Sequence, residues 1–293
     1  MKLCRYGEKG AERPGLVDRE GMLRDLSSHL KDVSPDVLAP TSLAQLSRIE
    51  TASLPRIDEP MRFGVPVQGI RKFLAIGLNY ADHAAESNLP VPSEPIIFTK
   101  AISCLSGPND DVMLPRGSTK SDWEVELGVV IGTTCRYVKR EHALGHVAGY
   151  VLVNDVSERE YQKERGSQWD KGKGCDTFGP CGPWLVTPDE VGDPQHLDLF
   201  LDVNGRRMQS GNTRTMIFDV KTLISYVSEF ITLEPGDLLI TGTPPGVGDG
   251  QKPHPIFLRE GDEMRLGITG LGEQRQRVIA WRCISSVPVR PRP

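Results

Sequence analysis

Two glutamates in one strand-like segment are the residues best suited to chemistry. Glu124 and Glu126 lie two positions apart in the segment DWEVELGVVIG. In a β-strand, residues two apart share a face, so both carboxylates point to one side while Val125 and Leu127 point to the other. Two like charges side by side are destabilising unless positive charge lies between them. Solvent counterions, an arginine or lysine, or a hard divalent cation can supply that charge.

A third carboxylate, Asp155, follows the apolar strand pattern at 150–154, where a strand end can present an acid to a cleft. Three carboxylates without a neighbouring cysteine or histidine favour an oxygen-only site, which suits Mg²⁺, Mn²⁺ or Ca²⁺ better than zinc. The spacing leaves two interpretations open: a site for such a cation, or a solvated strand face.

His83 and Glu86 form a second candidate pair, three residues apart in the segment NYADHAAE. On a helix these two positions are neighbours. A carboxylate on one imidazole nitrogen fixes the tautomer and leaves the other nitrogen to take a proton from water. The alternative is an ordinary surface pair without a catalytic role.

Two further segments are rich in polar residues or in glycine. The run 157–179 directly follows Asp155 and carries Arg159, Gln162 and Lys173. It is either a mobile lid with anion-binding groups or a solvated insertion. The segment TGTPPGVG at 241–248 offers backbone donors, but it lacks the G-K-[ST] signature of a P-loop.

The elements that must position these residues are mostly strands. Alternating or continuous apolar patterns predict strands, and turn residues such as Asn204-Gly205 separate them. In the segment 219–231, apolar residues at helical spacing and a candidate N-cap, Asp219, predict a helix. We expect strands at 2–6, 15–17, 123–131, 150–153, 197–203, 238–241, 263–268 and 277–283, and helices at 43–49, 80–87 and 219–231. The fold class is therefore α+β, mostly β.

Proline and glycine between residues 55 and 69 mark a boundary. We expect a small N-terminal α/β domain at 1–65, a main domain at 66–285 and a tail at 286–293.

Composition narrows the possible partners. The 293 residues include 35 Lys+Arg and 39 Asp+Glu, a net charge of −4 with no basic stripe, which argues against nucleic acid as a partner. The apolar runs are far shorter than the roughly 20 residues that span a bilayer, and the N-terminus lacks the apolar region of a signal peptide. The six scattered cysteines contain no C-x-x-C pair and suit free thiols. We expect a cytoplasmic protein that does not bind a membrane.

In chain order, several segments together resemble the fumarylacetoacetate hydrolase superfamily over roughly residues 70–280. These segments are GLNYADHAAES, FTKA, DWEVELGVVIG, GYVLVNDVSEREYQ, QWDKGKGCDTFGP, LEPGD and TGTPPGVG. The first 65 residues resemble the small domain that precedes the core in many members. The resemblance implies a mixed β-sandwich roll, a homodimer, and a divalent metal, usually Mg²⁺, with Mn²⁺ as the alternative.

The resemblance also implies a role for each matching residue. The metal ligands are Glu124, Glu126 and Asp155; the catalytic groups are His83, Glu86, Lys173 and Gln162; the substrate-binding groups are Lys100, Arg159 and Thr243. The sequence departs from the family pattern at Ala101, where a proline is frequent, and at Glu160, where the family usually has aspartate.

The activity implied is hydrolysis of the C–C bond of a 2,4-diketo acid to pyruvate and a carboxylic acid. The run WDKGKGCDTFGP most resembles members that act on 2,4-diketo-3-deoxy sugar acids such as 2,4-diketo-3-deoxy-L-fuconate, and similar chains are labelled ureidoglycolate lyase. The same site chemistry supports oxaloacetate decarboxylation and enol–keto isomerisation of 2-oxo acids. A metal-dependent binder of 2-oxo acids without turnover is the non-enzymatic alternative.

Overall fold

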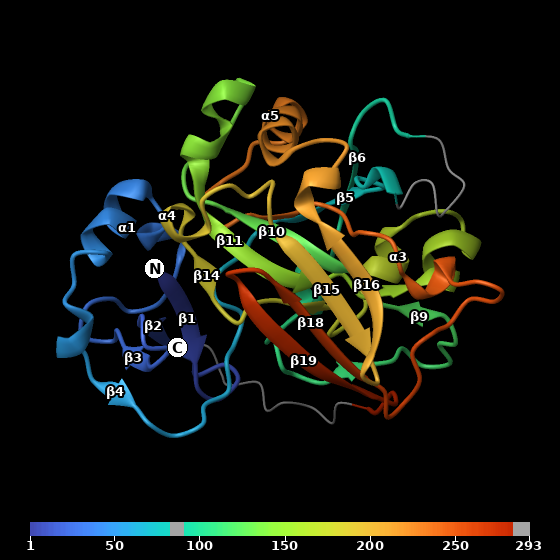
Figure 1. Cartoon of the computed structure of the whole chain (residues 1–293), viewed down its shortest axis with the longest axis horizontal. Helices are drawn as coiled ribbons and strands as arrows, with labels where there is room; N and C mark the ends of the chain where they lie inside the picture. Colours follow the sequence, from blue (N-terminus) through green and yellow to red (C-terminus); the bar gives the residue numbers. More distant parts are fainter. Residues whose placement is uncertain (83–90, 284–293) are drawn as a thin grey trace, which may run out of the picture.

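The larger sheet of the protein runs across the molecule (Figure 1). The computed structural model describes residues 1–82 and 91–283, and in this part of the chain that sheet has ten strands of mixed direction. In sheet order they are β4 (Arg56–Ile57), β3 (Leu23–Asp25), β2 (Arg13–Val17), β1 (Lys2–Tyr6), β14 (Leu185–Val186), β11 (Val147–Asn154), β10 (Val125–Ile131), β17 (Leu238–Ile240), β5 (Phe73–Gly77) and β6 (Ile96–Thr99). Strands β1–β4 thus extend the sheet that the rest of the chain forms.

Strands β10 and β11 lie in the interior and are buried along their whole length. Their sequences, VELGVVI and VAGYVLVN, are nearly continuous apolar runs, as expected of strands covered on both faces. The antiparallel register pairs Val125 with Asn154. The chain just before β10 and the chain just after β11 consequently lie at the same end of the sheet.

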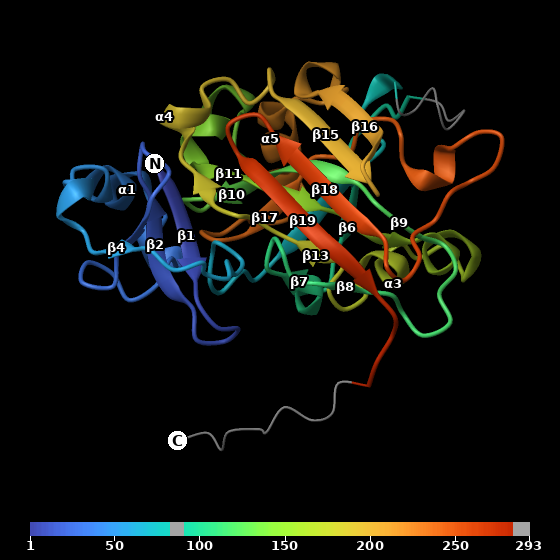
Figure 2. The same ribbon diagram turned by 60° about the horizontal axis from the view of Figure 1, so that its bottom comes forward.

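A second sheet packs against β10 and β11 (Figures 1 and 2). Its order is β16 (Arg206–Asn212), β15 (Asp198–Val203), β18 (Glu263–Ile268), β19 (Gly272–Ile279) and β8 (Val112–Met113). The predicted Asn204-Gly205 turn joins β15 to β16, and both residues have positive φ, 50° and 76°, as such hairpins require. Gln274 Nε2 of the second sheet donates to Leu152 O at 2.8 Å, so buried polar contacts join the sheets as well as apolar ones.

Shorter elements complete the molecule. Two strand pairs lie outside the main sheets: β9 (Ser121–Asp122) with β12 (Ser157–Glu158), and β7 (Leu105–Ser106) with β13 (Gly179–Pro180). The α-helices are α1 (Pro40–Leu46), α3 (Asp170–Lys173), α4 (Pro188–Val191) and α5 (Val220–Phe230), and a π-helical turn spans Glu160–Glu164. Turns of 3₁₀ helix occur at Pro35–Val37, Thr51–Ser53, Ile102–Cys104, Arg140–His146, Thr213–Thr215 and Gly248–Gly250.

Helix α5 has the boundaries that its sequence predicts. Asp219 is the N-cap, and its side chain accepts a hydrogen bond from Thr222 N at 2.8 Å. The apolar stripe Leu223, Ile224 and Val227 is fully buried. Capping and burial of one face stabilise a helix of this length, which would be marginal in isolation.

The α+β, mostly β, fold class is confirmed. The strand expected at 277–283 is wrong in position, because β19 spans Gly272–Ile279 and starts directly after the turn that closes the hairpin with β18. The helix expected at 80–87 falls largely outside the described residues, as does the tail at 286–293 entirely. The division of the chain at residue 65 stays a prediction.

Among the described helices, none has the length and apolar character needed to cross a membrane.

Candidate active site

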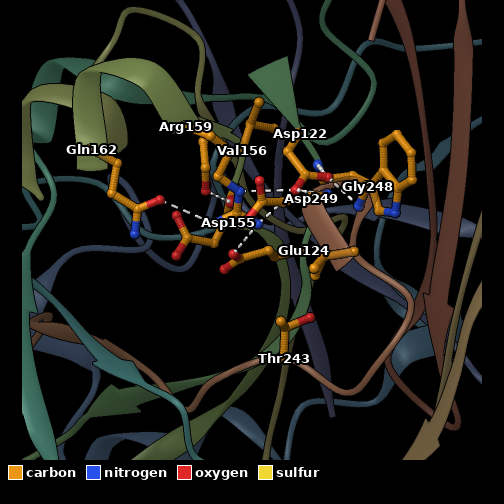
Figure 3. Close-up of polar contacts among 12 residues, drawn as sticks. Asp122, Glu124, Asp155, Val156, Arg159, Gln162, Thr243, Gly248 and Asp249 are labelled. Carbon is orange, nitrogen blue, oxygen red and sulfur yellow. Dashed lines mark hydrogen bonds and ion pairs between the residues drawn. The ribbon is translucent and has the colours of Figure 1, made fainter. Parts of the chain in front are cut away.

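Three carboxylates meet at one end of the sandwich because of the strand register. Glu124 immediately precedes β10, Glu126 is the second residue of that strand, and Asp155 follows β11. Asp155 N donates to Glu124 O at 2.8 Å, which continues the β10–β11 ladder by one step. One ligand oxygen from each of the three residues lies within 4.8 Å of the others, and all three residues are buried. We call these three residues the acidic triad; Figure 3 shows two of them, Glu124 and Asp155.

Glu126 is held by the glycine-rich loop. This loop follows β17, and Thr241 N and Oγ1 both bind Leu127 O, which keeps the loop beside β10. Gly242 N donates to Glu126 Oε2 at 2.7 Å. Burial raises the pKa of Glu126 well above its ordinary value, and the neighbouring charges of Asp155 and Glu124 raise it further.

Two buried lysines contact the triad from different sides. Lys173 Nζ lies 2.8 Å from Glu124 Oε2 and 2.6 Å from Asp155 Oδ2. Burial alone would lower the pKa of Lys173, but Asp155 and Glu124 raise it above its ordinary value, so the side chain is charged. Lys100 Nζ lies 2.6 Å from Asp155 Oδ1 and also donates to Val156 O, and its side chain is fully buried.

Arg159 connects the triad to a fourth carboxylate, Asp122 (Figure 3). Arg159 Nη2 lies 2.7 Å from Glu124 Oε1 and 2.8 Å from Asp122 Oδ2, and its Nη1 donates to Gln162 Oε1 at 3.0 Å. Asp122 is fully buried and also accepts from Gly248 N at 2.6 Å and from Asp249 N at 3.0 Å. Asp122 therefore fixes both the guanidinium of Arg159 and the turn at 248–250.

A cavity of about 310 Å³ opens over this cluster. Phe98 and Trp169, packed edge to face with centroids 5.2 Å apart, form an apolar wall. The remaining lining is largely polar and includes Glu124, Glu126, Arg159, Gln162, Lys163, Lys173, Thr243, Asp249 and Lys252. The volume suits a small molecule of a few carbon atoms.

The residues present fit a divalent cation with oxygen ligands. The triad offers carboxylate oxygens only, the ligand type that hard cations prefer. Although Lys100 lies close to Asp155 Oδ1, this buried oxygen accepts no hydrogen bond from any described residue. The raised pKa of Glu126 shows that the lysines and Arg159 do not fully compensate the triad. A bound dication would supply the missing positive charge.

The structure brings most of the predicted site residues together. Six of them line the cavity: Glu124, Glu126, Arg159, Gln162, Lys173 and Thr243. Asp155 contacts one of these, Lys173, at 2.6 Å. Thr243 Oγ1 donates to Val125 O at 2.8 Å, so the hydroxyl would have to leave this carbonyl to donate to a ligand. Lys100 contacts Asp155 but does not belong to the described residues that line the cavity. His83 and Glu86 lie outside the described residues.

Two of the non-functional alternatives that the sequence left open, a solvated strand face and a solvated insertion, are wrong. The face that carries Glu124 and Glu126 is not solvated, because these residues are 6% and 1% exposed. The run 157–179 is not a solvated insertion either. Its π-helical turn and α3 bury Arg159, Gln162 and Lys173 against the triad.

Sequence reasoning missed three residues of this site. Asp122 belongs to the DWEVE segment, but its partners lie 37 and 126 residues further along the chain. Trp169 gives no signal in the sequence, because its neighbour Gly77, where a Cβ would come within 2.6 Å of the Trp169 ring, is distant along the chain. Asp249 gives no signal of its own beyond its place after the glycine-rich segment.

Comparisons with known proteins agree with this geometry. Residues 72–279 match the family described as fumarylacetoacetate (FAA) hydrolase C-terminal. The chain is 63% identical to 2,4-didehydro-3-deoxy-L-rhamnonate hydrolase of Sphingomonas sp. (strain SKA58), over 96% of this chain and 97% of that protein. Solved structures with the same fold include fumarylacetoacetate hydrolase from psychrophilic Exiguobacterium antarcticum, with 36% identity, a TM-score of 0.84, and coverage of 96% of this chain and 100% of that one.

A further solved relative was determined with ligands. Maleylpyruvate hydrolase from Sphingobium sp. SYK-6, in complex with manganese(II) ion and pyruvate, is 30% identical with a TM-score of 0.79, over 96% of this chain and all of that one. Since the family match covers most of the chain and these relatives align over nearly its full length, the chain belongs to the fumarylacetoacetate hydrolase family and is an enzyme that hydrolyses a C–C bond of an acylpyruvate-like substrate.

Proposed function

We propose that this enzyme hydrolyses the C3–C4 bond of a 2,4-diketo-3-deoxy sugar acid and releases pyruvate and a hydroxy acid. The observation that carries the proposal is the buried acidic triad at the floor of a cavity whose polar lining is rich in cations. The Sphingomonas relative, a hydrolase of 2,4-didehydro-3-deoxy-L-rhamnonate, supports a deoxy sugar acid as the substrate class.

The acidic triad would hold Mg²⁺, with Mn²⁺ as the alternative, and the cation would act as a Lewis acid on the 2-oxo acid end of the substrate. The Sphingobium relative, whose structure is a complex with manganese(II) ion and pyruvate, supports a divalent cation and a 2-oxo acid as ligands of this family. Arg159 and Gln162 line the cavity beside the triad. Their donors would orient the substrate carboxylate, since guanidinium and amide groups both donate to carboxylate oxygens.

We assign the proton transfer and the stabilisation of negative charge during hydrolysis to side chains of this protein. His83, oriented by Glu86, would take a proton from water while the water oxygen bonds to C4. The C3–C4 bond then breaks, and its electron pair passes into the enolate of pyruvate. Lys173 is charged and faces the cavity, so it would stabilise the enolate oxygen. The proton taken from water is finally delivered to C3.

Lys100 has a different place in this scheme. Its ammonium group contacts Asp155 and backbone carbonyls and is fully buried. We propose that it fixes the orientation of Asp155 rather than touching the substrate, because it contacts Asp155 and does not belong to the described residues that line the cavity.

The test is pyruvate release, followed by a coupled assay, from a panel of 2-oxo acids with Mg²⁺ and with a chelator. The panel contains an acylpyruvate, a 2,4-diketo-3-deoxy sugar acid, fumarylpyruvate and oxaloacetate. We expect chelator-sensitive release from the sugar acid at the highest kcat/KM. Release from oxaloacetate alone would assign decarboxylation instead, and no release from any member would contradict the proposal.

Replacement of His83 tests the water-activating step. We expect His83→Ala to lower the hydrolysis of the diketo acid by roughly 10²–10⁴-fold, the usual contribution of a general base. Any decarboxylation of oxaloacetate should fall much less, since that reaction needs no nucleophilic water. Equal losses for both reactions would mean that His83 does not act through water.

A further inference from the structure

An ion pair lies across the mouth of the cavity, outside the catalytic groups described so far. Lys163 belongs to the π-helical turn Glu160–Glu164, and Asp249 belongs to the turn Gly248–Gly250. Lys163 Nζ lies 2.5 Å from Asp249 Oδ2, and both residues line the cavity. The two side chains are 50% and 31% exposed, so the pair is accessible to a ligand that enters from solvent.

The two halves of the pair are held on one buried frame. Asp122 accepts hydrogen bonds from Gly248 N and Asp249 N, which fixes the turn that carries Asp249 (Figure 3). The same carboxylate binds Arg159, which directly precedes the turn that carries Lys163. The two backbone segments that carry Lys163 and Asp249 are therefore both held by contacts of Asp122.

The carboxylate of Asp249 also interacts electrostatically with the charged residues around the acidic triad. Burial alone would raise its pKa, but Lys163 and Arg159 bring the pKa of Asp249 below its ordinary value, so it is ionised at neutral pH. Asp249 and Glu124 line the same cavity, and the charge of Glu124 opposes this effect. A substrate anchored at the triad by its 2-oxo acid end therefore extends toward this mouth or toward the wall formed by Phe98 and Trp169.

A carboxylate beside an ammonium group matches one kind of substrate tail. A hydroxyl group both donates and accepts hydrogen bonds, so it can donate to Asp249 and accept from Lys163. An alkyl tail gives neither contact, and a second carboxylate would face the negative charge of Asp249. We propose that Lys163 and Asp249 select 2,4-diketo acids that carry a hydroxyl group next to C4, over those with an alkyl or a carboxylate tail. This inference rests on the proposed C–C hydrolysis and names the part of the substrate that decides specificity.

The first experiment compares two substrates that differ by one hydroxyl group. One is a 2,4-diketo acid with a hydroxyl at C5, and the other is its C5-deoxy analogue. Pyruvate release gives kcat/KM for each with the Mg²⁺-loaded enzyme. Hydrogen bonds to charged groups predict a preference of about tenfold or more for the hydroxylated acid. We expect Asp249→Ala and Lys163→Ala, which lie on separate elements, each to reduce this preference to about threefold or less.

A neighbouring ion pair provides the matched control. Glu164 follows Lys163 in the same turn and pairs with Lys120 Nζ at 2.5 Å, but neither Glu164 nor Lys120 belongs to the described residues that line the cavity. Glu164→Ala removes a charge from the same turn, and we expect it to leave the substrate preference unchanged. An equal loss of preference in Glu164→Ala would assign the effect to the turn as a whole and overturn the proposal.

The second experiment looks for a gain of activity, which a misfolded variant cannot give. In Asp249→Asn the negative charge is lost while the shape is kept, and Lys163 is left to attract an anion. We expect kcat/KM for fumarylpyruvate, which has a carboxylate tail, to rise several-fold relative to the wild type. No rise, together with an unchanged hydroxyl preference in both alanine variants, would overturn the inference and leave the hydrolase intact. Failure of the wild type to release pyruvate from either C5 substrate would overturn the hydrolase proposal and this inference with it.

Discussion

Two networks of charged residues in this molecule differ in how completely their charges are paired. The first, the N-terminal network, consists of Arg5, Glu12, Asp32, Arg62 and Asp110. Here each carboxylate meets a guanidinium group: Arg62 binds Asp110 through two bonds of 2.7 Å and Glu12 at 3.0 Å. Arg5 binds Asp32 at 2.7 Å.

The pKa values of the N-terminal network reflect this pairing. Burial alone would raise the pKa of Glu12 and of Asp110, but the arginines bring both below their ordinary values. The hydrogen bonds that Arg62 donates to Asp110 raise the pKa of Arg62 in turn. The lowered pKa values of Glu12 and Asp110 keep both carboxylates ionised at neutral pH, where they pair with Arg62.

The second network, around the acidic triad, differs in the contacts of one carboxylate, that of Glu126. Lys100, Lys173 and Arg159 contact Glu124, Asp155 and Asp122, whereas Glu126 accepts a hydrogen bond from the backbone N–H of Gly242, and its pKa is raised. An uncompensated carboxylate in the interior costs stability. Each network has one carboxylate more than it has cations, so the difference lies in the contacts: in the second network Glu126 lines the cavity, where a bound cation can reach it.

The largest loss of activity should come from removing one carboxylate of the acidic triad. Glu124→Ala takes away one of the three carboxylates and leaves Lys173 and Arg159 without that partner. We expect kcat/KM for the diketo acid to fall about 10³-fold or more, because Lewis-acid stabilisation of a transition state is worth several kcal/mol. Circular dichroism should show an intact fold. A wild-type rate at limiting Mg²⁺ would contradict the metal assignment.

A smaller effect should follow from Asp122→Asn, which keeps the shape and hydrogen-bonding oxygen but removes the charge that holds Arg159. Groups that orient ligands or substrate contacts are commonly worth about 10–100-fold in activity, and we expect a loss in that range. The loss should appear mainly in KM if Arg159 binds the substrate carboxylate. Asp198→Asn provides the control, because Asp198 is exposed and bonds Asn212 on the second sheet. A loss of activity confined to kcat would instead argue for a role in the chemical step.

The contrast between Glu124 and Asp122 also shows what a sequence can predict. Glu124 and Glu126 are found from the strand period of two, a local property of DWEVE, and Asp155 from the end of an apolar run. Asp122 stands in the same segment, yet its function comes from Gly248 and Arg159, which only the folded chain brings near.

Lys100 shows the same dependence on the folded chain, for a residue that the sequence does single out. Its position in FTKA assigns it to the substrate by resemblance, whereas in the folded chain it follows β6, is buried and contacts Asp155. Fold class and helix α5 follow from local patterns of burial and capping. The register between strands that are distant in sequence cannot be predicted from such local patterns, because it depends on packing across the whole sandwich.

The smallest effect on activity should come from the N-terminal network. Arg62→Met leaves Asp110 and Glu12 without their shared guanidinium while both stay largely buried. We expect a loss of about 1–3 kcal/mol in the free energy of unfolding, measured with urea, and an unchanged kcat/KM. Arg265→Met, which breaks an exposed pair with Glu273, should change neither quantity measurably.

The pH dependence separates this loss from a packing defect. Because Asp110 and Glu12 have lowered pKa values in the folded protein, their contribution is complete above the ordinary carboxyl pKa of about 4 and is lost as the pH falls through their folded values. The stability difference between the wild type and Arg62→Met should therefore be constant near neutral pH and shrink below about pH 4. A difference that stays constant into acid would mean that the aliphatic stem of Arg62, not its charge, stabilises this region, and the contrast between the two networks would then lose its electrostatic basis.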